Sequence, residues 1–232
     1  LQWTNNTGHA FIKDCEVEIG GQKIDKHYDQ WLDVHNELTD HDQADWLGLN
    51  KHAAVKPYLT SGESLSPTTS PMRLYVPLQF WFCRNPGLAL PLIALQYHEV
   101  KINIEIRPMD ECLFAVTQVG VSAAPGKNVK ATAAYSKSLV AASLYVDYIF
   151  LDTDERRRMA QNPHEYLIEQ LQFTGDESIG SSSNKIKLNF NHPCKELIWV
   201  VQPDDNVRYC DSFVETKVLN MALGAQPFNY TD

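Results

Sequence analysis

The sequence predicts an all-β protein, a β-sandwich of the jelly-roll kind with short inserted helices. In several segments apolar and polar residues alternate with a period of two, the pattern of half-buried strands. Other short segments are apolar on both faces, and helical spacing is confined to two stretches. With 232 residues, 44% hydrophobic and 21% charged, the composition is that of one or two globular domains and excludes disordered, collagen-like and coiled-coil proteins.

The clearest half-buried strand is predicted at residues 100–107, where four aliphatic side chains face one way and four polar ones the other. Residues 14–19 alternate in the same way and lead into Gly20-Gly21, which predicts the start of a hairpin. Residues 185–190 alternate as well. Each of these segments is expected to form one strand of the sandwich.

Strands buried on both faces are predicted at residues 74–82, 144–151 and 197–201, because these segments are apolar throughout. Pro77 moves the first of them toward a sheet edge or a bulge, since proline cannot donate to a ladder. About ten strands are expected in total by this reading of the pattern.

Two helices are predicted between the strands. The first, over Asp25 to Leu38, rests on residues that recur at spacings of four and three: Ile24, Tyr28, Trp31, His35 and Leu38. The second begins at Asp152 or Thr153 as N-cap, carries acidic residues first and basic ones later, and is ended by Pro163.

The charge of the chain argues against nucleic-acid binding. Twenty Lys and Arg against 29 Asp and Glu give a net charge of −9, and an acidic surface repels phosphate. The one basic triplet, Arg156 to Arg158, stands beside acidic residues. The longest apolar run, Leu88 to Leu95, is interrupted by Pro91 and falls short of the roughly 20 residues that span a bilayer, so membrane insertion is not expected.

No metal or other cofactor is predicted. The five cysteines are odd in number and lack a CxxC pair, so they are expected to be reduced, with Cys15 and Cys83 as small apolar residues within strands. A patch of possible ligands lacks HxxxH or HxH spacing and is interpreted as a solvated loop. Its members are His35, Asp40, His41, Asp42 and Asp45.

No catalytic residue is predicted, because the chain has no GxSxG, P-loop or GxGxxG motif, and His98-Glu99 lacks the HxH of a cupin site. Carboxylates that could serve glycoside hydrolysis are expected on the solvated surface; they are Glu99, Glu105, Asp110 and Glu111. Two sequons mark Asn5 and Asn229 as candidate glycosylation sites, although such triplets are common by chance.

Four longer stretches are more specific than these patterns. They are residues 17–28 (VEIGGQKIDKHY), 85–100 (NPGLALPLIALQYHEV), 145–153 continuing at 163–173 (YVDYIFLDT and PHEYLIEQLQF), and 188–193 (LNFNHP). Together they resemble the major capsid proteins of nucleocytoplasmic large DNA viruses, nearest to the phycodnavirus and giant-virus forms. The resemblance extends over nearly the whole chain.

The resemblance implies a double jelly roll, two β-sandwiches side by side, with three copies forming a pseudo-hexagonal capsomer of an icosahedral shell. Residues 1–151 are then the first jelly roll without its N-terminal strands, 152–164 a linker helix, and 165–232 the incomplete start of the second. Implied partners are the chain itself as a homotrimer, neighbouring capsomers and minor capsid proteins, with assembly in the host cytoplasm and residence in the virion. Both ends look cut, so the chain alone is expected to leave sandwich edges unpaired and to aggregate.

An intersubunit contact is expected at the apolar segment Gly87 to Leu95. Its candidate interface residues are Pro86, Gly87, Leu88, Leu90, Pro91 and Leu92. A loop packed over the end of the sandwich is an equally good reading of the same segment. The helix over Asp25 to Leu38, the acidic loop to Asn50 and the loop at Thr60 to Pro71 are further surface candidates.

The alternative function is a carbohydrate-binding or carbohydrate-cleaving jelly-roll domain, with tryptophans as stacking platforms: Trp3, Trp31, Trp46 and Trp81. Trp81 stands in an apolar segment and Trp31 on the apolar stripe of the expected helix. Both are therefore expected in the core, which weighs against a sugar site.

Overall fold

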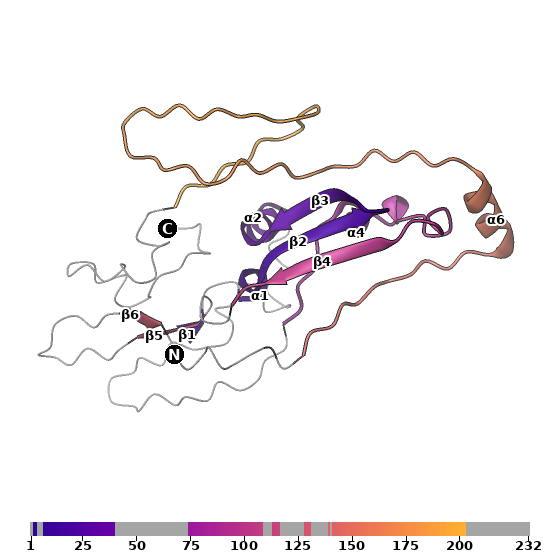
Figure 1. Ribbon diagram of the computed structural model, residues 1–232, viewed down its shortest axis with the longest axis horizontal. Coiled ribbons are helices and arrows are strands. Elements are labelled where there is room, and N and C mark those ends of the chain that lie inside the picture. The colour runs from indigo at the N-terminus through magenta and orange to yellow at the C-terminus, as the bar shows by residue number, and fades with distance from the viewer. Residues whose placement is uncertain are drawn as a thin grey trace, which may run out of the picture.

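The computed structural model is elongated, with one packed sheet and two long extended segments that lead to and away from a helix at one end of the molecule (Figure 1). Its helices and strands follow one another as β1 (Gln2–Trp3), α1 (Thr7–Phe11), β2 (Ile12–Ile19), β3 (Gln22–Tyr28), α2 (Asp29–Thr39), α4 (Trp81–Arg84), the 3-10 turn η1 (Pro86–Leu88), β4 (Val100–Ile106), β5 (Leu113–Val116), β6 (Asn128–Lys130) and α6 (Thr153–Gln161). The structure describes residues 2–3, 7–39, 74–108, 113–116, 128–130, 139 and 141–202.

The main sheet is antiparallel and has the order β3-β2-β4, so β2 lies in the middle. The β2–β3 hairpin turns at Gly20 and Gly21, whose φ angles of 59° and 82° are left-handed and suit glycine. Cys15 of β2 is opposite His27 on one side and Ile104 on the other. The predicted hairpin and the predicted strand at residues 100–107 are both confirmed. A smaller sheet has the order β1-β5-β6.

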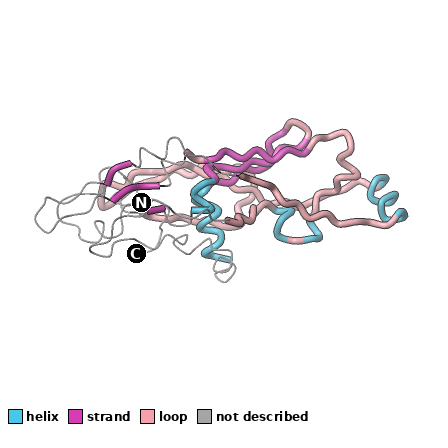
Figure 2. Tube along the Cα trace, turned by 90° about the horizontal axis from the view of Figure 1, so that it is seen from below, coloured by secondary structure: helices cyan, strands magenta, loops and turns pink. Residues whose placement is uncertain are grey.

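The core lies between one face of the main sheet and the helices α2 and α4, which cover it (Figure 2). It is built from Ile12, Cys15, Val17, Leu32, Phe80 and Trp81. Burial raises the pKa of the Cys15 thiol to about 12, so this cysteine behaves as the small apolar residue that its strand predicts. The same prediction is wrong for Cys83, which is exposed on α4.

Arg107 ties both N-terminal helices to the end of β4. Its guanidinium lies 2.6 Å from a carboxylate oxygen of Asp29 at the start of α2, and its Nε donates to the carbonyl of Ala10 in α1 at 3.0 Å. Its backbone N–H donates to the carbonyl of Phe11 at 2.8 Å. Burial outweighs the Arg107 charge and raises the pKa of the Asp29 carboxyl.

The first predicted helix begins four residues later than expected. Asp25 to Tyr28 belong to β3, and α2 starts at Asp29. The helical spacing of Ile24 and Tyr28 is real, but pairing with β2 across the Gly20-Gly21 turn holds these residues in a strand. Leu38, expected on the apolar stripe, is 60% exposed.

Four predicted strands are absent from this part of the chain. The segment 74–82 is extended without a ladder and enters α4 at Trp81. Residues 144–151, 185–190 and 197–201 likewise have no strand assignment, and the described residues hold six strands rather than about ten. These segments have apolar faces but no partner strand among the described residues, and a ladder needs both.

The second predicted helix is confirmed as α6. The side chain of Asp152 accepts a hydrogen bond from the backbone N–H of Glu155 at 2.8 Å, which makes it the N-cap. The helix ends at Gln161, two residues before Pro163. No side chain of α6 is buried, so caps and charge order, rather than packing, define this helix.

Candidate assembly interface

The predicted interface segment lies in residues 85–99, which follow α4 and are here called the ledge. Short-range hydrogen bonds hold its backbone. The Asn85 side chain caps η1 by accepting from the N–H of Gly87 at 2.9 Å. Further turns close between Pro91 and Ala94 at 2.9 Å and between Leu95 and His98 at 2.8 Å. Prolines with fixed φ angles and these short-range bonds give the ledge a defined shape without a ladder.

The ledge is anchored to the core on its inner side. Leu88 and Leu90 pack against the core cluster, and Pro91 is half-buried. Pro86 and Gly87 are exposed, and Leu92 is 46% exposed. The six candidate residues therefore divide into three that hold the ledge in place and three that face outward.

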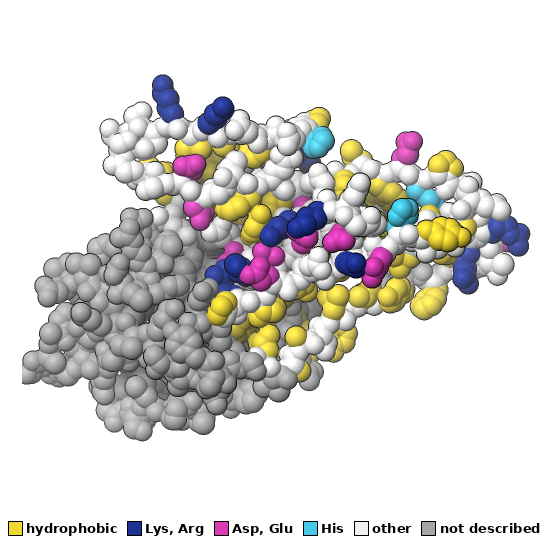
Figure 3. Space-filling view, in the orientation of Figure 1, with side chains coloured by type: hydrophobic (Ala, Val, Ile, Leu, Met, Phe, Trp, Pro, Cys, Tyr) yellow, Lys and Arg dark blue, Asp and Glu magenta, His cyan; other side chains and the backbone are white. Residues whose placement is uncertain are grey.

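The ledge also lines an open, mostly apolar pocket of about 430 Å³. Ile19 of β2 and Trp81 of α4 also line it, together with Ala160 of α6 and side chains from the stretch 162–168 that follows α6. The core contacts of the inner half are those expected if the segment is a loop packed over the end of the sandwich. The outer half is a free surface of the described chain (Figure 3 shows apolar side chains along this end of the molecule).

The C-terminal end of the ledge is hydrogen-bonded to the tip of the β2–β3 hairpin. The N–H of Gly20 donates to the carbonyl of Glu99 at 2.9 Å. A Cβ at Gly20 would lie 2.7 Å from Nδ1 of the exposed His98 side chain, which would have to turn away, and the left-handed φ favours glycine in addition.

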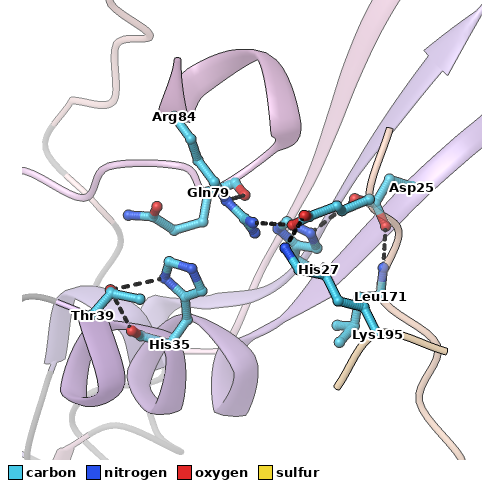
Figure 4. A network of polar contacts seen from close by, with 9 residues as sticks. Asp25, His27, His35, Thr39, Gln79, Arg84, Leu171 and Lys195 are labelled. Atoms are coloured by element: carbon cyan, nitrogen blue, oxygen red, sulfur yellow. Dashed lines mark hydrogen bonds and ion pairs between the residues drawn. The ribbon is translucent and has the colours of Figure 1, made fainter. Parts of the chain in front are cut away.

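A buried polar network lies beside the ledge, and the sequence analysis did not single it out (Figure 4). His27 Nε2 lies 3.0 Å from Asp25 Oδ2, with both side chains at most 2% exposed, and the His27 ring stacks on Phe80 at 4.5 Å. Asp25 Oδ1 accepts from the N–H of Leu171 at 3.1 Å. The sequence feature that could have revealed this pair is its spacing: Asp25 and His27 are two residues apart, so in a strand both side chains lie on the same face.

Charged groups extend this network. Glu169 contacts Arg84 at 3.1 Å and also pairs with Lys195, and the hydrogen bond from Lys195 holds the pKa of Glu169 below its ordinary value. Burial, the Arg84 charge and His27 lower the pKa of His35 to about 4. Two segments far apart in sequence, residues 169–171 and strand β3, are thus joined by polar contacts.

The described residues hold no cluster of three or more side chains suited to a metal ion. Glu99 and Glu105 form exposed ion pairs with Lys101 and Lys13, which confirms their solvated reading. Trp81 is in the core as predicted, and Trp31 is partly buried on α2. Asn5, Asn229, Trp46, Asp110, Glu111, residues 40–50 and the loop at 60–71 lie outside the described residues, as does the side chain of Trp3.

Within the described ranges, no helix combines the length and the apolar character that crossing a bilayer requires.

Comparison with known families covers both halves of the chain. Residues 1–152 match the family of major capsid protein N-termini, and residues 155–231 match the large eukaryotic DNA virus major capsid proteins. The chain belongs to this capsid protein family. The predicted resemblance is confirmed.

Individual relatives agree with the family match. The chain is 57% identical over its whole length to the major capsid protein of Chrysochromulina ericina virus and 58% identical to that of Phaeocystis pouchetii virus. It spans 43% and 47% of those two proteins, so less than half of their length. A quasi-atomic structure of the PBCV-1 virus capsid matches 82% of this chain and 42% of that chain, with a TM-score of 0.54 and 39% identity.

These capsid relatives bear on the fold and on the alternative function. The family likeness to the PBCV-1 capsid supports a sheet-based fold with few helices. The relatives are named as capsid proteins, so an enzyme or a sugar-binding module is not favoured for this chain.

Proposed function

We propose that this chain is part of a structural capsid subunit that assembles into the shell of a large DNA virus. The observation that carries the proposal is the tandem match: one capsid family covers residues 1–152 and another covers 155–231. A subunit of this kind acts by self-association and carries out no catalysis. The virion is its place, after assembly in the host cytoplasm.

The finer architecture that we propose is a double jelly roll. Residues 1–151 belong to the first sandwich, 152–164 form the linker with α6, and 165–232 open the second. The capped α6, which buries no side chain, supports a linker at this point, because a helix without a buried face does not belong to a core. The main sheet and its core supply part of the first sandwich.

Three subunits then form a pseudo-hexagonal capsomer, which meets neighbouring capsomers and minor capsid proteins. Many modest interfaces between identical subunits suffice for a stable shell, because their contributions combine. We assign the outward residues of the ledge, Pro86, Gly87 and Leu92, to one such contact. Their anchored neighbours, Leu88, Leu90 and Pro91, keep the contact surface in a fixed shape.

Light scattering on the complete subunit, released from particles by mild disruption, tests the assembly role. The expected mass is that of a trimer, and cryo-EM of the shell is expected to display pseudo-hexagonal units. A stable monomer that binds sugars would overturn the proposal in favour of the carbohydrate-directed alternative.

The ledge is tested separately with Leu92→Glu, which places a charge at the proposed contact. Ile179→Glu is the matched control, because Ile179 is a 57% exposed aliphatic residue far from the ledge in sequence. Leu92→Glu is expected to shift the trimer toward monomer and the control to leave it intact. If the two variants have the same proportion of trimer to monomer, the ledge is not part of the interface.

A further inference from the structure

Within the part of the chain that the structure describes, strand β3 is at the edge of the main sheet, which has the order β3-β2-β4. An edge strand presents unpaired backbone groups on which another chain can add a strand, and proteins that must avoid this cover the edge. Residues 168–173, here called the strap, run along the outer side of β3 in the same direction (Figure 1).

The strap contacts β3 at three successive points. The Gln170 side chain donates to the carbonyl of Ile24, the Leu171 N–H donates to Asp25 Oδ1 at 3.1 Å, and the Phe173 ring packs on Tyr28 at 5.0 Å. Residue numbers rise together along both segments, so the strap is parallel to β3. The first two bonds each use a side chain of one partner, and the strap is not part of a described strand ladder.

Asp25 is the fixed half of this attachment. Its carboxylate is 1% exposed; Oδ2 contacts His27, and Oδ1 accepts from the backbone N–H of Lys26 at 2.9 Å and from the Leu171 N–H of the strap. Oδ1 already has one donor within β3, and the Leu171 N–H is a second donor that fills its remaining acceptor capacity, so loss of the strap leaves this buried oxygen less completely satisfied. The His27 ring, held between Asp25 and Phe80, fixes the direction of that oxygen.

The strap is also held from its far side. The Gln172 amide donates to the carbonyl of Asn191 and accepts from its N–H, both at 2.9 Å, as a backbone peptide would. Glu169 is shared by Arg84 of α4 and by Lys195. Ile168 packs against the core cluster at the start of the strap.

We propose that the strap is an edge cover: it occupies the free edge of β3 and prevents a second copy of this chain from adding a strand there. Self-association is thereby directed to other surfaces, a conclusion that rests on the assembly role proposed above. Because the strap is attached largely through side chains and not by a full ladder, it can detach while β2, β3 and β4 stay paired. A detached strap leaves an edge suited to β-strand addition.

The test uses the complete polypeptide with Gln170→Ala and Gln172→Ala combined, which removes bonds on both sides of the strap and leaves Asp25 and the core untouched. The matched control is Gln96→Ala with Gln161→Ala, two exposed glutamines outside the strap. Hydrogen exchange is followed by mass spectrometry on peptides from residues 22–28, 12–19 and 100–106. Sedimentation velocity follows self-association over a range of concentrations.

The strap variant is expected to exchange about tenfold faster in residues 22–28, with residues 12–19 and 100–106 unchanged, because only the edge opens. It is also expected to associate at concentrations where the control does not. A synthetic peptide of residues 164–175, added in excess, is expected to reverse both effects by covering the edge in trans.

Unchanged exchange in residues 22–28 would overturn the proposal. Equal acceleration in all three strands would also overturn it, because the whole sheet would then have opened and not only its edge. Glu169→Gln provides a second variant if the double one does not fold. It is expected to speed hydrogen exchange in residues 22–28 about threefold and to leave the other two strands unchanged, since it weakens charged contacts alone. Failure of the trimer proposal would be seen in light scattering of the unaltered subunit and would not change the exchange pattern.

Discussion

Two regions of this chain are both predicted as strands from their sequence and have opposite environments. In β2, Cys15 and Val17 are fully buried between the sheet partners and the helices. In the segment 144–151, here called the arm, every residue from Leu144 to Phe150 is exposed, and Phe150 reaches 93%. β2 alternates apolar and polar residues and the arm is apolar along almost its whole length, yet both patterns predict a strand, so the pattern does not tell which segment finds partners.

The difference lies in pairing and not in hydrophobicity. β2 pairs with β3 directly across a Gly-Gly turn and has a second partner in β4, and helices cover one face. The arm has neither a ladder nor a covering layer among the described residues. An apolar pattern indicates that a segment gains stability from burial. Which other segment buries it depends on how the whole chain folds.

The largest expected contrast is between two phenylalanines. Phe80→Ala removes a fully buried ring that stacks on His27 and Phe82, and is expected to lower the free energy of unfolding by about 3–5 kcal/mol. Phe150→Ala in the arm is expected to change it by less than about 0.5 kcal/mol. Urea unfolding of the 232-residue chain at low concentration, followed by tryptophan fluorescence, measures both. Similar losses for the two variants would show that the arm is packed in solution.

Two left-handed glycines sharpen the contrast at the backbone level. Gly20→Ala combines a φ of 59° with a Cβ placed 2.7 Å from the His98 ring, and is expected to cost about 2 kcal/mol. Gly175→Ala has a φ of 91° but nothing within 4 Å of the new Cβ, so about 1 kcal/mol or less is expected. Chemical denaturation compares the pair. If Gly20→Ala lowers the free energy of unfolding by no more than Gly175→Ala does, the contact between the ledge and the hairpin is not tightly packed in solution.

The packed region is also expected to respond to pH through His35. Its pKa is about 4 in the folded chain and 6.5 when unfolded, so the unfolded state binds more protons between these values. Stability is therefore present above about pH 6.5 and is lost as the pH falls toward 4, by about 1–2 kcal/mol after allowance for solvent screening. His35→Gln is expected to flatten this part of the profile, measured by urea unfolding at stepped pH. An unchanged slope in that variant would assign the dependence to other groups.

The smallest expected effect is at α6, beyond the packed region. Asp152→Ala removes the N-cap and is expected to destabilise the helix by about 1 kcal/mol. Because α6 buries no side chain, unfolding of the main sheet should be unchanged. Hydrogen exchange in residues 153–161 is the readout, with Asp154→Ala for comparison, since it keeps the cap and removes one exposed first-turn charge together with its ion pair to Arg157. A lower midpoint for the whole chain would mean that α6 is coupled to the core.

The elements that were predicted correctly are those specified by neighbours in sequence. The Gly20-Gly21 turn, the alternation at residues 100–107 and the Asp152 cap each depend on a few adjacent residues. The errors occurred where a distant segment decided the outcome. Tyr28 has helical spacing to Trp31 but pairs with Asp14 in the sheet, and Trp81 follows an apolar run but starts a helix against the core.

The sequence by itself determined the capsid protein family, the absence of a recognisable catalytic motif, and the local turns and caps, because these depend on residue types at fixed spacing. Only the tertiary structure decided which half of the ledge is anchored and which faces outward. It also brought Asp25 and His27 against Leu171, 146 residues from Asp25 along the chain. The physical reason is that burial and hydrogen-bond partners are set by contacts between distant segments, and no local pattern of residues encodes which segments meet.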